Sequence, residues 1–207
     1  MSLRHRRRGF TLVELLVVIG VIAVLAALAI PALSGVRRNS QRANTKNLIT
    51  ELGLAIENYQ LDFGDYPPST PKRAGLTSNG KNDGVEALVR CLTTQAKNGP
   101  YFEFKDDQLG NTDVDALPRG NPTQSTIAVA ELFEVVDDWG NPLVYWNNAD
   151  YDKPATCVKI DGATIVASAG KAGKTGQYAD LTKFQLWSAG PDGEPGTDDD
   201  VSSWSSE

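Results

Sequence analysis

The chain has 207 residues, a formal net charge of −6 and a pI of about 4.9. An acidic balance of this kind argues against nucleic-acid binding through a basic face. His5 is the only histidine, and no GxSxG, HExxH, Walker-type loop or CxxC pair occurs. Because no histidine-dependent triad or histidine-ligated metal is available after residue 5, and no other catalytic motif is present, we expect a protein that is not an enzyme.

Residues 10–33 form an apolar run whose only charge is Glu14. As a helix rising about 1.5 Å per residue, the run would extend about 36 Å, enough to cross a bilayer core of about 30 Å. Apolar residues occur all round the helix rather than on one stripe, which favours a membrane span over a buried core helix. The four arginines before the run predict a single-pass segment with a cytoplasmic N-terminus.

Glu14 is costly in such a segment, by about 2.5 to 3.5 kcal/mol at a helix centre and less near the interface. One interpretation is that its carboxylate snorkels toward the preceding arginines. The other requires removal of the leader after Gly9, which leaves a positive amine on Phe10. In an assembly this amine could pair with Glu14 of the next subunit, an attraction of about 4 kcal/mol at 4 Å and an effective dielectric near 20. Glu14 is then an assembly contact.

The stretch "GFTLVE", residues 9–14, with the apolar run behind it, resembles the class III signal of type IV pilins and pseudopilins. The resemblance implies that a prepilin peptidase removes residues 1–9 by cutting after Gly9, and methylates Phe10. It also places Pro31 where the family kinks its first helix, since an interior proline removes a backbone hydrogen bond.

An ordinary secretory signal peptide is the competing interpretation, with a basic region before the apolar run and an A-x-A site at residues 27–29. The apolar run is longer than the usual 7 to 15 residues, and Glu14 interrupts its beginning. Both features disfavour this alternative.

The next segments continue in a helical pattern. Apolar residues at helical spacing in 48–59 predict one long helix over about 11–61, whose second half packs on a domain through Leu48, Leu52, Ala55, Ile56 and Tyr59. Gly64, Pro67 and Pro68 follow and are typical of a helix end. Residues 84–93 predict a second, short helix, and the polar, turn-rich residues 98–124 predict a long surface loop.

Beyond residue 140 the pattern becomes typical of strands. β-branched and aromatic residues predict strands at 141–146 and 183–190, and the segments 156–160 and 164–168 are further candidates. The predicted fold class is therefore α+β: a long N-terminal helix, membrane-spanning in its first half, packed on a small antiparallel β-sheet.

Four stretches, "YQLDFGDYPPS", "GVEALV", "DDWGNPLVYW" and "LWSAGPDGEPGTDDDV", together resemble the landmarks of the major pseudopilin of type II secretion. The resemblance implies a type IV pilin-like fold with residues 34–207 as a periplasmic globular domain. The chain departs from the family's compact form in three segments that we call the insertions: 72–83, 98–124 and 147–178.

The resemblance also implies a cellular setting. The precursor would be a single-pass inner-membrane protein with a periplasmic C-terminus, and mature subunits would self-assemble into a helical fibre, the periplasmic pseudopilus. The implied partners are the prepilin peptidase, minor pseudopilins and the inner-membrane secretion platform.

The C-terminal loop concentrates four aspartates within nine residues, beside glycines and a proline that bend the backbone. Calcium prefers six to eight oxygen ligands in a flexible geometry, and the spacing is not that of an EF-hand. A solvated acidic tail is the alternative from residue types alone. The family resemblance implies calcium, with the Ala189 carbonyl, Asp192 and one or two of Asp198, Asp199 and Asp200 as ligands.

Cys91 and Cys157 are the only cysteines. In an oxidising compartment a disulfide between them is plausible, and two buried free thiols are the alternative.

These patterns predict a structural subunit of a type II secretion pseudopilus that supports protein export across the outer membrane. A type IV pilin of a surface fibre, for adhesion, motility or DNA uptake, is the first alternative. A single-span, membrane-anchored binding domain is a second, and an exported hydrolase is disfavoured because no nucleophile and base can be named.

Overall fold

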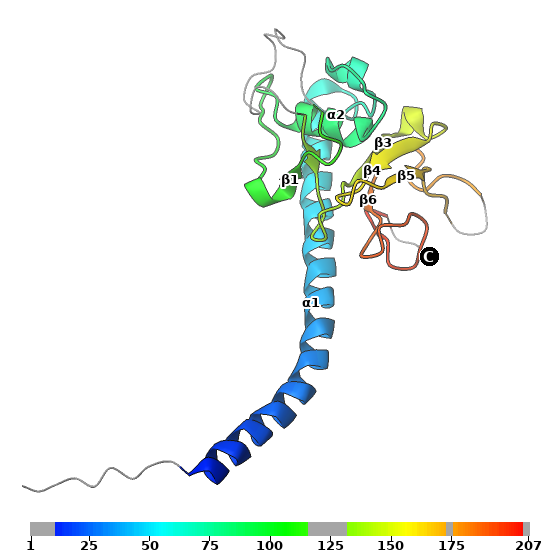
Figure 1. The fold of residues 1–207 in the computed structure, drawn as a ribbon. Coiled ribbons are helices and arrows are strands. Elements are labelled where there is room, and N and C mark those ends of the chain that lie inside the picture. Colours follow the sequence, from blue (N-terminus) through cyan, green and yellow to red (C-terminus); the bar gives the residue numbers. More distant parts are fainter. Residues whose placement is uncertain (1–10, 116–131, 173–175, 205–207) are drawn as a thin grey trace, which may run out of the picture. The chain divides into compact units, whose positions relative to one another are not determined.

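The computed structural model describes residues 11–115, 132–172 and 176–204, and no side chains at 26 and 28–34. The chain divides into two units, Met1–Ser40 and Gln41–Glu207. Figure 1 shows the elements, of which the strands and the shorter helices all belong to the second unit.

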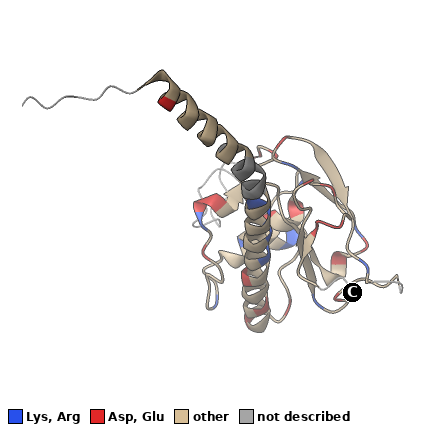
Figure 2. Cartoon of the chain, turned by 90° about the horizontal axis from the view of Figure 1, so that it is seen from below, with Lys and Arg blue, Asp and Glu red and all other residues tan. Residues whose placement is uncertain are grey.

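Helix α1 runs over Leu12–Phe63 and confirms the predicted long helix. It is continuous through Pro31 and ends at Gly64, which has a positive φ of 83° and donates its N–H to the Gln60 carbonyl. Glu14 is the only charge in residues 11–36, and the described ribbon of this part is tan in Figure 2 apart from one red segment. Within the described part of the chain, no helix meets the length and hydropathy of a membrane span. Phe10 and several side chains of the predicted 10–33 segment lie outside the described residues.

The second half of α1 contributes the predicted stripe to a hydrophobic core. Leu48, Leu52, Ala55 and Ile56 are buried, and Tyr59 is partly buried against them. The stripe packs with apolar side chains of α2 and of the central sheet.

Helix α2 covers Asp83–Leu92, one residue from the predicted start and end. Gly84 in its first turn lies against the sheet: a Cβ there would be 2.4 Å from the Tyr145 carbonyl oxygen. The absence of a side chain at Gly84 therefore lets the helix start close to strand β3. Nearly the whole of α2 is buried, including Glu86.

The central sheet has three antiparallel strands in the order β3-β6-β7, with bounds Val144–Asn147, Phe184–Ser188 and Val201–Ser202. Its side chains alternate between two faces, as the period of a strand requires. Tyr145 and Leu186 belong to the core shared with α1, whereas Trp146 and Trp187 stack on the opposite face.

A hairpin of β4, Ala155–Val158, and β5, Thr164–Ala167, lies in the third insertion and confirms the two candidate strands. Its residues Cys157 and Ala167 join Trp146 and Trp187 in a second hydrophobic cluster. Both faces of the central sheet are therefore buried, because the third insertion covers the face turned away from α1.

The second insertion differs from the predicted surface loop. In its described part, a 3-10 turn at Asp106–Gln108 leads into β1, Leu109–Gly110, which pairs antiparallel with β2, Glu134–Val135. Phe102, Phe104 and Leu109 also pack on the core. Polar residues dominate the average composition of this segment, and the sequence pattern therefore indicated a surface loop although these three side chains are apolar. Two further 3-10 turns occupy Pro71–Ala74 and Asn148–Asp150.

Candidate assembly and cation sites

Glu14 has a partner within its own helix. Its Oε2 accepts hydrogen bonds from the Thr11 N–H at 2.9 Å and the Thr11 hydroxyl at 2.8 Å, and the Glu14 N–H donates to the Thr11 hydroxyl at 3.2 Å. This reciprocal pattern is a capping box, which satisfies N–H groups at a helix start. Thr11 and Glu14 stand three residues apart before an apolar run, which is the sequence pattern of a capping box. The sequence therefore contained a signal for Thr11 as a partner of Glu14, in addition to the leader arginines and the amine of Phe10.

The two predicted processing residues, Gly9 and Phe10, lie outside the described residues. Pro31 lies inside α1, and its side chain is not among those described.

The predicted calcium loop joins β6 to β7. Asp192 and Asp198 are exposed, whereas Asp199 and Asp200 are half-buried and Ala189 is buried. The loop is closed by backbone contacts at Gly190, which has a φ of 66° and where a Cβ would be 2.6 Å from the Asp199 carbonyl oxygen.

Two basic residues of α1 hold the end of this loop. The Arg42 guanidinium donates to the carbonyls of Asp199 and Asp200 at 2.9 and 3.3 Å. Lys46 donates to the carbonyl of Ser202 in β7. The C-terminal loop is thus fixed to the helix through backbone carbonyls, which leaves the aspartate side chains for other contacts.

The aspartates of the loop differ in what they contact. Asp192 accepts from the Glu194 N–H, and Asp199 accepts from the Thr197 hydroxyl. Asp200 accepts from the Gly196 N–H through Oδ2, while its Oδ1 is buried without a partner. Burial, with Asp199 and Asp192 nearby, raises the pKa of Asp200. The unpartnered Oδ1 fits the ligand role predicted for Asp200. Glu194 has an exposed side chain that pairs with Lys159 at 3.0 Å.

In the structure Cys91 and Cys157 are both buried free thiols, which is the second of the two alternatives considered for them. They lie in different surroundings: Cys91 on α2 lies close to Tyr59, and Cys157 belongs to the second hydrophobic cluster with Trp146 and Trp187. Burial raises the pKa of Cys91 to about 11 and that of Cys157 to about 12, so neither thiol is activated as a nucleophile.

Asn82, immediately before α2, connects all three insertions. Its N–H donates to Thr156 O at 2.8 Å, and its Oδ1 accepts from the Val158 N–H at 2.9 Å. Its Nδ2 donates to the Thr112 hydroxyl at 2.9 Å and to Glu134 Oε1 at 2.7 Å. Asn82 is buried and has a φ of 47°, a left-handed conformation that asparagine tolerates better than most residues.

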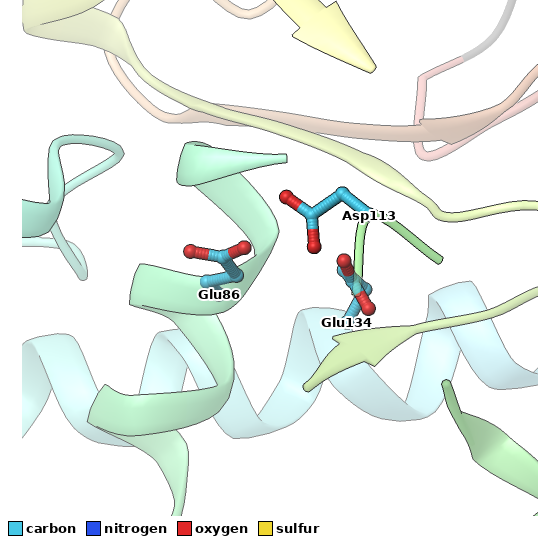
Figure 3. Close-up of side chains that lie close together, drawn as sticks. All are labelled: Glu86, Asp113 and Glu134. Atoms are coloured by element: carbon cyan, nitrogen blue, oxygen red, sulfur yellow. The ribbon is translucent and has the colours of Figure 1, made fainter. Parts of the chain in front are cut away.

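Beside Asn82 lies a group of acidic residues that sequence analysis did not identify. Oxygens of Glu86, Asp113 and Glu134 all lie within 4.8 Å of one another, close enough to hold a metal ion. Figure 3 shows the three carboxylates side by side, from α2, from the second insertion and from β2. Among the described residues no other group of acidic, cysteine or histidine side chains meets this spacing, the C-terminal loop included.

The pKa values of the carboxylates in this group are raised. Burial, together with the nearby charges of Asp115 and Asp113, raises the pKa of Glu86 to about 9. Burial also raises the pKa of Glu134, against the lowering effect of the hydrogen bonds from Asn82 and Thr112. The pKa of Asp115 rises to about 6 through burial and the charges of Asp113 and Asp83. Burial and the neighbouring negative charges therefore outweigh the lowering effects of Lys81 on Asp115 and of the hydrogen bonds on Glu134.

Comparisons with known proteins agree with this arrangement of a long apolar helix and a small α+β unit. A family model described as "Prokaryotic N-terminal methylation motif" matches residues 4–30. The chain therefore carries the N-terminal methylation motif of a class of prokaryotic proteins.

Longer matches define the particular family. The chain is 28% identical to Type II secretion system core protein G of Escherichia coli strain K12 over 204 residues, 99% of this chain and 95% of the relative. The protein of the same name from Klebsiella pneumoniae is 30% identical over 125 residues, 57% of this chain and 89% of that relative. The fimbrial protein EcpC of Eikenella corrodens is 38% identical over 81 residues, 38% of this chain and 52% of that relative.

The chain belongs to the Type II secretion system core protein G family, the major pseudopilins. The family is structural and non-enzymatic. No solved structure matches the chain.

Proposed function

We propose that the protein is a structural subunit of a type II secretion pseudopilus, which supports the export of proteins across the outer membrane. The observation that carries the proposal is the match to core protein G over nearly the whole chain, joined to the methylation motif at residues 4–30. The role is mechanical, and the chain supplies a long apolar helix for packing between subunits and a folded unit behind it.

Family membership implies prepilin processing, pilus assembly, an inner-membrane precursor and a periplasmic fibre. In finer detail, we propose that residues 1–9 are a leader removed by the prepilin peptidase, with Phe10 becoming methylated. Residues 10–33 then form the membrane and assembly segment, and residues 34–207 the periplasmic domain. Minor pseudopilins and the inner-membrane secretion platform are the proposed partners.

Glu14 is the proposed assembly contact. Only its Oε2 takes part in the capping box with Thr11, so Oε1 remains available to the amine of a neighbouring subunit's Phe10. The cap and the intersubunit pair are compatible, because one carboxylate has lone pairs for both.

Calcium in the C-terminal loop is the proposed cofactor. Asp200 Oδ1 is a buried oxygen without a partner, and Asp192 and Asp198 are exposed and close in sequence. A bound cation would supply the positive charge that offsets the repulsion among the four aspartates. Because Arg42 and Lys46 already hold the backbone of 199–202, the ion would add to an existing attachment of the loop.

The experiment that tests the proposal is intact-mass analysis of the chain purified from cells with and without prepilin peptidase. We expect a mature form that begins at N-methylated Phe10, and expect Gly9→Val to leave the precursor uncut, because a branched side chain does not fit beside the scissile bond. A chain that retains its leader, or starts at Ile30 after the A-x-A stretch, would refute processing as a pseudopilin.

A type IV pilin of a surface fibre is the second candidate, favoured by the similarity to fimbrial protein EcpC over part of the chain. The two functions predict different neighbouring genes, a secretin with secretion components or a retraction machinery. They also predict different phenotypes on deletion: a block in export for the pseudopilin, and a loss of surface fibres for the pilin.

A further inference from the structure

The acidic group beside Asn82 contains most of the unpartnered buried polar atoms in the described residues. Five buried carboxylate oxygens in this group have no hydrogen-bond partner: both oxygens of Glu86 and one each of Asp83, Asp113 and Asp115. Buried polar atoms in proteins are almost always hydrogen-bonded, so a concentration of exceptions needs an explanation.

Glu86 is the strongest exception. Its side chain is only 2% exposed, it lies in a helix that is buried on nearly all sides, and neither of its oxygens has a hydrogen-bond partner. A surface carboxylate could turn to water, but Glu86 has no such route. Its carboxylate lies beside those of Asp113 and Glu134 (Figure 3).

The surrounding contacts keep the other carboxylates in place. Asn82 and the Thr112 N–H each hold one oxygen of Glu134, at 2.7 and 3.2 Å. Asn79 donates to Asp113 at 2.7 Å and to Asp115 at 2.8 Å, and in both residues the other oxygen is buried and unpartnered. Glu134 is thus oriented by two contacts and Asp113 and Asp115 by one each, and all three carboxylates still have lone pairs for a ligand.

We propose that Glu86, Asp113 and Glu134 bind a divalent cation, calcium, at a second site that is separate from the C-terminal loop. Asp83 and Asp115 lie close enough to interact with the group electrostatically and supply further oxygens or negative charge. The ion joins α2 and β2 to the second insertion, and Asp83 is the last residue of the first insertion.

The donor set selects calcium. All of the available donors are oxygens, and there is no histidine after residue 5, which disfavours zinc and copper. Several carboxylates lie close to one point, as they do in calcium sites, where protein oxygens supply most of the ligands. Magnesium instead keeps several water ligands and uses only one or two carboxylates. The carboxylates also come from three separate segments, which suits the variable coordination geometry of calcium.

The test is calcium binding to the full-length chain in detergent micelles, measured by isothermal titration calorimetry after removal of metal with a chelator. We expect Glu86→Gln to lose one bound calcium per chain, because the amide keeps the shape of the side chain but removes its charge. Asp113→Asn should lose the same ion, and its half-exposed position makes a folding defect less of a concern. Glu51→Gln, an exposed carboxylate on α1, is the matched control and should bind as the unchanged chain does.

The two sites are separated by Asp200→Asn in the C-terminal loop. If both proposals hold, the unchanged chain binds two calcium ions, each single variant binds one, and Glu86→Gln with Asp200→Asn binds none. If only the C-terminal proposal fails, Glu86→Gln still removes the one ion that binds. The inference is refuted if Glu86→Gln and Asp113→Asn leave the number of bound calcium ions unchanged, or if magnesium or zinc binds this site at lower concentration than calcium.

Discussion

Asn82 offers a direct test of how the three insertions are held together. In the structure its side chain makes three hydrogen bonds between 2.7 and 2.9 Å: those to Val158 and Glu134 are buried, and the one to Thr112 is partly buried. Asn82→Ala removes the three together and leaves their partners inside the protein. The substitution also places alanine at a φ of 47°.

The expected loss of stability follows from these two effects. A hydrogen bond contributes about 1 kcal/mol net, so loss of the three costs about 3 kcal/mol. Alanine in the left-handed region adds about 1 kcal/mol. The total of about 4 kcal/mol corresponds to a fall in melting temperature of about 8 to 16 °C for a folded unit of this size. Asn82→Gly loses the same hydrogen bonds without the backbone strain, so it should melt about 2 to 4 °C above the alanine variant.

The assay is thermal unfolding of the full-length chain in detergent, followed by tryptophan fluorescence in the presence of chelator. All four tryptophans lie between residues 139 and 204, so the signal reports on the unit Gln41–Glu207. Asn47→Ala, at an exposed position on α1, is the control and should change the melting temperature little. If Asn82→Ala melts within about 2 °C of that control, Asn82 does not hold the insertions and the reasoning is wrong.

Two further predictions concern carboxylates in the two units. Glu14→Gln keeps a side chain that can complete the capping box with Thr11, whereas Glu14→Ala does not. Because we propose that the charge of Glu14 is needed for assembly, we expect both variants to be processed and neither to form fibres. Normal fibres from Glu14→Gln would show that the capping box alone matters. The second prediction concerns pH: since the pKa of Glu86 rises from 4.5 to about 9, and that of Glu134 also rises, the folded state retains protons that the unfolded state releases. The free energy of unfolding in chelator should therefore fall as pH rises from about 5.5 to about 7.5, by up to about 1.4 kcal/mol per pH unit for each group. Calcium should reduce this slope, and thermal unfolding with and without chelator measures it; a melting temperature in chelator that stays constant or rises over this range would contradict the prediction.

The longer elements of the fold were predictable because each had a local pattern. The apolar run and the stripe at Leu48, Leu52, Ala55 and Ile56 predicted α1, and Gly64 with the following prolines predicted its end. The aromatic and β-branched stretches predicted the strands β3 and β6, and the hairpin was recognised as a candidate. A local pattern in one segment was sufficient for these elements, whereas the short strands β1, β2 and β7 were not predicted.

The covering of the second sheet face was not predictable in this way. Trp146 and Trp187 follow the alternation of their strands, and alternation alone does not say whether the outward face meets water or protein. This face of the sheet meets protein because the third insertion packs Cys157 and Ala167 against these tryptophans. Such packing depends on contacts between segments far apart in the chain, which no local window contains.

Glu86 shows why the acidic group beside Asn82 also escaped sequence analysis. In the stretch "GVEALV", one glutamate among apolar residues has the appearance of the polar side of an amphipathic helix. It is buried because the first and second insertions and β2 surround α2, and these segments bring Asp83, Asp113 and Glu134 with them. Insertions that merely covered an apolar surface would have no need of several carboxylates at their point of contact. Their convergence on one point, with five oxygens left unpartnered, is the reason to regard the first two insertions as parts of a cation site rather than as loops of variable length.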